Sequence, residues 1–158
     1  MPVDRQTGLI TYSKVKEMSG ITKADLYNRA LSWANTYYKN PADVIREKDE
    51  EQGKIICKAR YKIMNPPDKK GFSSEAGNVQ YTLNLQFKEG KYKYELTEIN
   101  WKQPSYYGVE KWMDTSNAYY KQEFACYLQQ VDSASKEIIS SLDKIMKTNA
   151  AKNEKNDW

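Results

Sequence analysis

Hydrophobic and polar residues alternate strictly along residues 79–87, which predicts a β-strand with one apolar face. The apolar positions are Val79, Tyr81, Leu83, Leu85 and Phe87, and the polar positions are Gln80, Thr82, Asn84 and Gln86. Residues 88–91 then place Gly90 where a tight hairpin needs a positive φ, and Tyr92, Tyr94 and Leu96 continue the alternation. Residues 78–101 are therefore predicted to form a β-hairpin whose apolar face must be covered by other elements.

The alternation slips after Leu96, because Ile99 and Trp101 fall on the opposite parity, and this predicts a bulge or a strand end near residues 97–98. Further strands are predicted over residues 9–18, 44–50 and 54–64. The second of these is rich in charge and is placed at or near a sheet edge. Residues 65–77 are predicted to form a loop because Pro66 and Pro67 break the strand pattern.

Two segments have helical spacing. Thr22 followed by Asp25 is typical of a helix start, and the apolar stripe that follows predicts a helix to about Tyr38, stopped by Pro41. A second helix is predicted from about Asn117 to near Lys147, with its apolar stripe at Phe124, Leu128, Val131, Ser135, Ile138, Leu142 and Ile145. The predicted order is β-α-β-β-β-β-α, an α+β fold with both helices on one face of an antiparallel sheet and the other face open to water.

Composition sets broad limits on this fold. A chain of 158 residues with 13% aromatic residues fits one folded domain, which we place at residues 9–148 between a tail at 1–8 and a flexible tail at 149–158. The formal net charge of +4 is mild and lacks the concentrated Lys and Arg of a nucleic-acid-binding protein. No apolar run approaches the ~20 residues of a membrane span.

The two cysteines are expected to be free thiols. Cys57 lies on the apolar face of its predicted strand, whereas Cys126 points away from the apolar stripe of its helix. These two placements argue against a disulfide bond between them, because such a bond needs both side chains close together. The cysteines therefore do not indicate a redox compartment.

Several segments together resemble a known family. They are residues 19–33, 43–45, 53–56, 79–83 and 141–146. This ordered set is similar to a bacterial domain of unknown function with a TATA-binding-protein-like (TBP-like) fold, over roughly residues 9–147. The resemblance implies a single TBP-like repeat with a curved sheet and both helices on one face. It also implies an extracytoplasmic protein, periplasmic or secreted, whose leader is absent from this sequence. The family carries no established activity, so it implies no catalytic residues.

The residues themselves argue against catalysis. The chain has no histidine, the usual proton shuttle near neutral pH, and therefore no Cys–His pair. No glycine-rich loop precedes a helix to hold a phosphate. The carboxylates of residues 49–51 are most simply explained as solvated residues of a turn. We expect no enzymatic activity, no cofactor and no metal site.

Two surfaces are candidates for binding. Lys58, Arg60 and Lys62 project from one predicted strand, beside the amide and hydroxyl face of the next, and such a platform suits a polyanion or an extended partner. The alternative is an ordinary solvated sheet face. Tyr106, Tyr107 and Trp112 form an aromatic loop of the kind that contacts proteins or glycans. The alternative is that these rings close the end of the core beneath the long helix.

The leading hypothesis is a non-enzymatic, extracytoplasmic binding module that uses one of these surfaces to bind a protein, a glycan or a small ligand. A carrier with its site between sheet and helices is the alternative, although bulky Tyr, Leu, Phe and Trp residues favour a filled interior. A carboxylate-based enzyme and a nucleic-acid-binding protein are further alternatives. The TATA-binding protein inserts apolar wedges into the minor groove, whereas the open face here offers amides and lysines. The sequence does not specify an oligomeric state.

Overall fold

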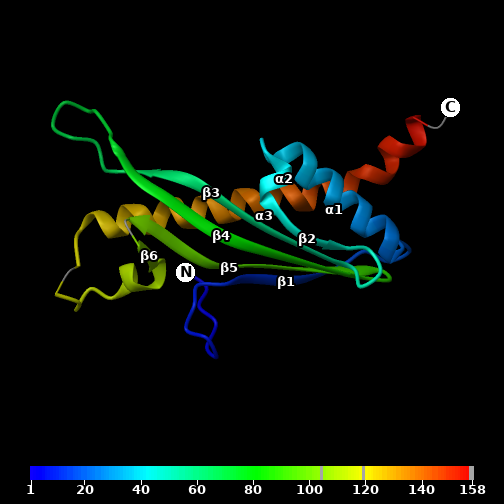
Figure 1. Cartoon of the computed structure of the whole chain (residues 1–158), viewed down its shortest axis with the longest axis horizontal. Helices are drawn as coiled ribbons and strands as arrows, with labels where there is room; N and C mark the ends of the chain where they lie inside the picture. The colour runs from blue at the N-terminus through cyan, green and yellow to red at the C-terminus, as the bar shows by residue number, and fades with distance from the viewer. Residues whose placement is uncertain (104, 119, 157–158) are drawn as a thin grey trace. The chain divides into compact units, whose positions relative to one another are not determined.

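The computed structural model describes the backbone of residues 1–103, 105–118 and 120–156, and the side chains of these residues except 103, 105–107 and 148–156. The elements follow the predicted order, with a short helix, a short strand and a 3₁₀ turn in addition (Figure 1). They are β1 Tyr12–Glu17, α1 Lys23–Tyr37, α2 Pro41–Val44, β2 Ile45–Asp49, β3 Lys54–Met64, β4 Glu75–Lys88, β5 Lys91–Gln103, β6 Ser105–Gly108, η1 Val109–Met113 and α3 Glu123–Asn156.

Six strands of the described chain belong to one open antiparallel sheet, in the order β1-β5-β4-β3-β2 with β6 paired to β5. The predicted α+β class is therefore confirmed. The charged strand β2 lies at the edge, as predicted, and pairs antiparallel with β3 from Ile45 opposite Cys57 to Asp49 opposite Lys54. The strand β1 forms the other end of this order.

The two local irregularities predicted in the central hairpin are also present. Gly90 has a φ of 76° in the β4–β5 turn, the left-handed conformation that glycine adopts without strain. Glu98 has a φ of 51°. The buried residues before it are the even-numbered Tyr94 and Leu96, and the buried residue after it is the odd-numbered Ile99. A left-handed residue inside a strand is what moves the apolar set to the other parity.

Several predicted boundaries are wrong. The strand β1 begins at Tyr12 and not at residue 9, and β4 begins at Glu75 because the loop before it closes earlier, with the Asn65 N–H donating to the Ser74 carbonyl at 2.8 Å. The helix α3 begins at Glu123 and not near residue 117, since residues 114–117 form a turn around Asp114. It continues to Asn156 and not to Lys147.

The chain folds as two compact units, and β3, β4, β5 and α3 contribute to both. The first unit contains Met1–Tyr12, Lys58–Thr82 and Leu96–Ser135, and the second contains Ser13–Cys57, Leu83–Glu95 and Lys136–Trp158. The predicted domain limits at residues 9 and 148 stay a prediction.

In the first unit, α3 is held to the end of β3 by polar side chains. The Gln130 side chain accepts the Met64 N–H at 2.8 Å and donates to the Met64 carbonyl at 2.8 Å. The Tyr127 hydroxyl donates to the side-chain oxygen of Asn65. The core beside these contacts is aromatic, and its rings are Trp101, Trp112, Phe124 and Tyr127.

In the second unit, both helices cover the apolar face of the sheet, as predicted. The ring of Tyr27 on α1 meets the ring of Phe87 on β4 with centroids 5.9 Å apart. The Tyr92 hydroxyl on β5 donates to Asp143 on α3. The cap predicted for α1 is also formed, because the Thr22 hydroxyl accepts the Asp25 N–H at 3.1 Å.

The two cysteines are free, as predicted: Cys57 is fully buried in the second unit, and Cys126 is half-buried in the first. Burial raises the pKa of the Cys57 thiol to about 12. Burial and nearby carboxylates also raise the pKa of buried tyrosines: Tyr12 donates to Asp132 at 2.6 Å, and Tyr92 bonds to Asp143.

These raised pKa values predict a loss of stability in alkali. A tyrosine with a folded pKa above its unfolded value near 10 contributes stability that is complete below about pH 10 and is lost as pH rises towards the folded pKa. Urea denaturation at increasing pH should therefore show the free energy of unfolding falling from about pH 10 upward. The double variant Tyr12→Phe, Tyr92→Phe should show a shallower fall. Equal slopes for this variant and the native chain would contradict the assignment.

Candidate functional site

The predicted basic residues of β3 lie on the open face of the sheet in the first unit. Arg60 and Lys62 are exposed and Lys58 is half-buried. Lys62 forms an ion pair with Glu75 at 3.0 Å, with side chains 65% and 60% exposed, so this pair contributes little. Among the described residues, Lys58 and Arg60 have no acidic partner. Half-buried Gln80 and Thr82 belong to the polar set of β4, as predicted.

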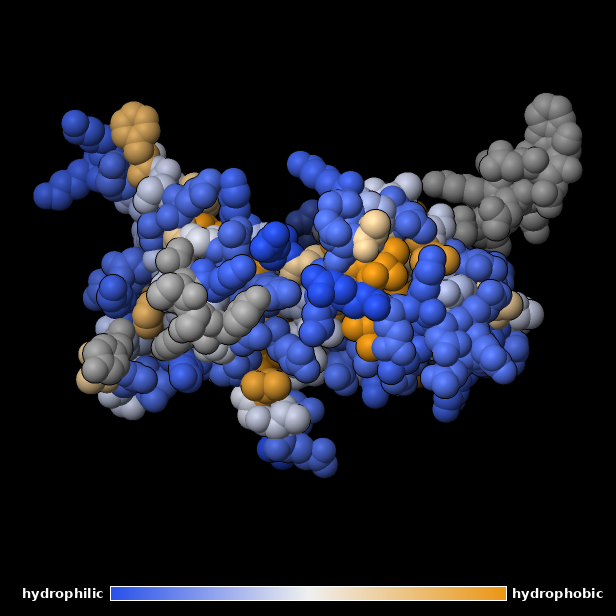
Figure 2. All heavy atoms as spheres, viewed as in Figure 1, coloured by the Kyte–Doolittle hydropathy of each residue, from blue (hydrophilic) through white to orange (hydrophobic). Residues whose placement is uncertain are grey.

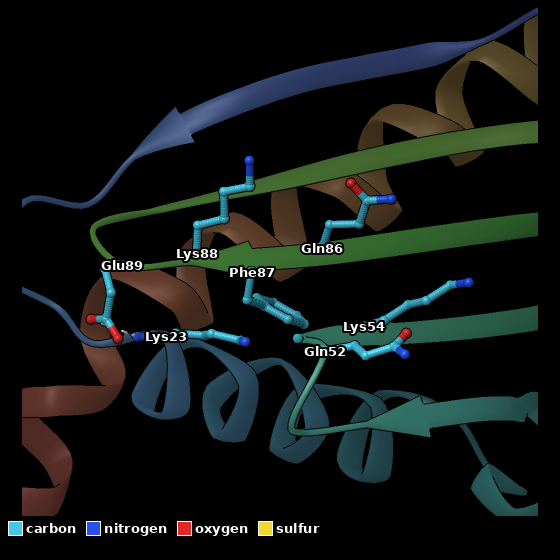
Figure 3. A pocket seen from close by; sticks show the side chains of 8 residues that line it. Lys23, Gln52, Lys54, Gln86, Phe87, Lys88 and Glu89 are labelled. Carbon is cyan, nitrogen blue, oxygen red and sulfur yellow. Dashed lines mark hydrogen bonds between the residues drawn. The ribbon is translucent and has the colours of Figure 1, made fainter.

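A pocket of about 510 Å³ lies in the second unit, where the β2–β3 and β4–β5 turns meet the start of α1 (Figure 3). Gly53 positions these segments, because its carbonyl accepts the Phe87 N–H at 2.8 Å and its φ is 70°. A Cβ at this position would lie 2.6 Å from the Phe87 carbonyl oxygen and 2.7 Å from Cε of Lys23. Only glycine fits there without displacing the lysine side chain.

Lysine side chains dominate the charge of this pocket. The Lys23 ammonium donates to the Glu51 carbonyl, and the Lys23 N–H donates to Glu89 at 3.2 Å. Lys54 pairs with Glu47 at 3.8 Å. Figure 3 shows the Lys23 side chain directed beneath the Phe87 ring. The lining of the pocket therefore contains three lysines and one glutamate, and Phe87 is its one aromatic residue.

Lys88 and Gln86 point away from the Phe87 ring, because neighbouring side chains on a strand alternate between its faces (Figure 3). Both residues also line a second pocket, of about 240 Å³, which we call the Val15 pocket. Its lining residues are Val15, Gln86, Lys88, Lys91, Tyr92 and Lys93. Val15 is 50% exposed on β1, which is unusual for a valine in a strand.

The three lysines of the Val15 pocket are exposed and have no acidic partner among the described residues. Lysines that form no ion pair contribute positive local potential, which attracts anions. The sequence shows this cluster as Lys88, Lys91 and Lys93 around the hairpin turn, but its meeting with Val15 depends on the pairing of β1 with β5. Sequence reasoning did not identify this pocket.

The aromatic loop does not present Trp112 on an exposed binding surface, which was one of the two interpretations of its sequence. Trp112 is only 1% exposed, so it cannot be a surface contact and instead closes the core, the alternative interpretation. In η1, Val109 and Trp112 are three residues apart and lie on one side of the turn, and both are buried. The backbones of Tyr106 and Tyr107 pair with β5 in β6, but their side chains lie outside the described residues.

The described residues contain no group of three or more His, Cys, Asp or Glu side chains that could hold a metal ion. The carboxylates of residues 49–51 lie in the turn after β2, where Asp49 accepts the Gln52 N–H at 3.0 Å. In the part of the chain that the structure covers, no helix is both long and apolar enough to cross a membrane.

The fold and these surfaces define a TBP-like α+β domain with an open, partly cationic sheet face. Residues 12–102 match the family model for a domain of unknown function (DUF4468) with TBP-like fold, and the chain belongs to this family, as its sequence features indicated. The comparison with curated proteins gives no match.

Solved structures have the same fold. A DUF4468 family protein from Bacteroides ovatus is 17% identical with a TM-score of 0.74, covering 92% of this chain and 90% of its own. A TBP-like protein from Parabacteroides distasonis is 14% identical with a TM-score of 0.63, covering 90% of this chain and 96% of its own. At such identities the likeness concerns the fold alone.

Proposed function

We propose that this domain is a non-enzymatic binding module that receives an anionic partner on the open face of its sheet. The observation that carries the proposal is the group of Lys88, Lys91 and Lys93, exposed around one pocket without acidic partners among the described residues. Unpaired surface cations raise the rate and the selectivity with which a complementary anion is bound. The unpaired Lys58 and Arg60 of the first unit support the same charge preference.

We place the module outside the cytoplasm, in the periplasm or secreted, on the basis of the family resemblance in the sequence. Its partner is then an acidic protein segment, an anionic glycan or a small anion. Duplex DNA is a weaker candidate, because the exposed large apolar side chains on strands of the described chain are few and scattered, whereas minor-groove binders insert apolar wedges. The visible surface is mostly hydrophilic (Figure 2).

A small-ligand carrier is the second candidate, favoured by the pocket of about 510 Å³. This volume lies within the ~300–1,000 Å³ of typical ligand sites. The pocket opens where two turns meet the start of α1, and its charged lining residues are Lys23, Lys54, Lys88 and Glu89, a net positive set that suits a small polar anion. Citrate is a suitable probe, and a calorimetric titration without measurable heat would remove this candidate.

The test of the main proposal measures binding to immobilised heparin and poly-glutamate, with neutral dextran as the blank. The variant Lys88→Glu, Lys91→Glu, Lys93→Glu should bind at least ~10-fold more weakly than the native chain, and with a smaller salt dependence. A matched variant, Lys39→Glu, Lys69→Glu, Lys70→Glu, has the same net charge but alters exposed lysines elsewhere. Equal losses in both variants, or no polyanion binding by the native chain, would contradict the proposal.

A further inference from the structure

The lining of the Val15 pocket combines an exposed valine with three lysines, so it offers both apolar surface and positive charge to a partner. Val15 is 50% exposed, and its side chain is aliphatic. The lysines at positions 88, 91 and 93 contribute methylene stems as well as charges, since long cationic side chains cover apolar surface with their stems. A purely ionic partner would leave this apolar surface in water, whereas a partner with an apolar group would bury it.

The size of the pocket limits what can enter. Its volume of about 240 Å³ is smaller than that of a typical small-molecule site, which holds a whole ligand in ~300–1,000 Å³. One large side chain of a longer partner fits such a space. Peptide recognition commonly works in this way, with pockets for single side chains providing specificity along an extended segment.

The position of β1 suits an extended peptide. This strand lies at the end of the sheet order, with β5 as its neighbour and no strand beyond it in the described part of the chain. An outer strand presents unpaired backbone N–H and C=O groups, with which another extended segment can pair. Val15 lies on this strand, so a peptide paired along β1 lies next to the Val15 pocket, and a large side chain that reaches across β1 contacts Val15.

We infer that the preferred partner is an extended acidic peptide with one large apolar side chain, which enters the Val15 pocket while flanking carboxylates pair with Lys88, Lys91 and Lys93. This inference rests on the proposed function, since it specifies which anion the open face binds. The charge of the three lysines is complementary to the carboxylates, and the exposed valine is complementary to the apolar side chain.

The test uses a labelled synthetic peptide, Gly-Glu-Asp-Glu-Leu-Glu-Asp-Glu-Gly, and a second peptide with alanine in place of leucine. Fluorescence anisotropy should show the leucine peptide binding the native chain about tenfold more tightly. The variant Val15→Asp should remove this preference. Val3→Asp is the matched control, because Val3 is 43% exposed in the first unit, and it should keep the preference.

Decanoate is a further probe, because it joins a carboxylate to an alkyl chain without a peptide backbone. Stronger competition by decanoate than by the leucine peptide would overturn the peptide assignment in favour of a small amphiphile. Equal binding of the leucine and alanine peptides would overturn the inference but leave the proposed anion-binding function intact. No binding of either peptide, together with no binding of polyanions, would contradict both.

Discussion

Replacing Trp112 with alanine is expected to lower the free energy of unfolding by about 4 kcal/mol, the usual cost of removing a large buried aromatic side chain. Trp112 is 1% exposed. Its ring centroid lies 5.4 Å from that of Trp101, 5.8 Å from that of Phe124 and 5.3 Å from that of Tyr127. The alanine variant would therefore leave a cavity lined by three aromatic rings that cannot fully collapse.

Urea denaturation followed by tryptophan fluorescence and by circular dichroism measures this loss. Phe72→Ala is the matched control, because Phe72 is also a large aromatic residue but is 71% exposed in the β3–β4 loop. It should change the free energy of unfolding by less than about 0.5 kcal/mol. A loss below about 1 kcal/mol for Trp112→Ala would show that the tryptophan is not a core residue and would reopen its role as a surface contact.

The second large effect concerns Arg29, a charged residue that is only 1% exposed on α1. Its Nη1 donates to the Met146 carbonyl at 2.6 Å, and its Nη2 donates to Asp25 at 2.9 Å. Because the guanidinium joins α1 to α3 within the second unit, Arg29→Ala removes both the hydrogen bonds and the packing of the side-chain stem. We expect a loss of about 3 kcal/mol in the free energy of unfolding.

Replacing Arg29 should lower the free energy of unfolding far more than replacing its partner Asp25. Asp25 is 39% exposed, so water can solvate its carboxylate when the arginine is absent. Arg60→Ala is the control for arginine on the surface and should cost less than about 0.5 kcal/mol. Arg29→Lys keeps the charge but not the two-pronged geometry, and it should recover only part of the loss. Native-like stability of Arg29→Ala would contradict this role.

Most of the fold was predictable because it depends on local periodicity. The strict alternation along β4 predicted a half-buried strand, and the glycine at position 90 predicted the turn. The slip at Glu98 was visible because a change of parity can be counted along the sequence. Helix ends were less predictable, because the apolar stripe of α3 ends near Ile145 whereas the helix itself continues to Asn156 through residues without proline or glycine.

The candidate site was less predictable than the fold. The unpaired cations of β3 were found, because alternation alone places Lys58 and Arg60 on the polar face. The sequence did not decide whether Trp112 is buried, since a tryptophan in a loop is equally compatible with a surface contact and with a core residue. The Val15 pocket was missed because Val15 on β1 meets the lysines of the β4–β5 hairpin only in the folded sheet, and no sequence spacing joins it to them.

The sequence by itself determined which residues share a face of each strand and helix, because periods of 2.0 and 3.6 residues follow from backbone geometry. It therefore determined the α+β class and the polar character of the open sheet face. Only the tertiary structure decided which faces meet: that Trp112 packs among other rings, that Arg29 reaches Met146, and that three lysines line one pocket with Val15. These arrangements depend on strand order and on packing between segments far apart in the chain, which a local pattern does not specify.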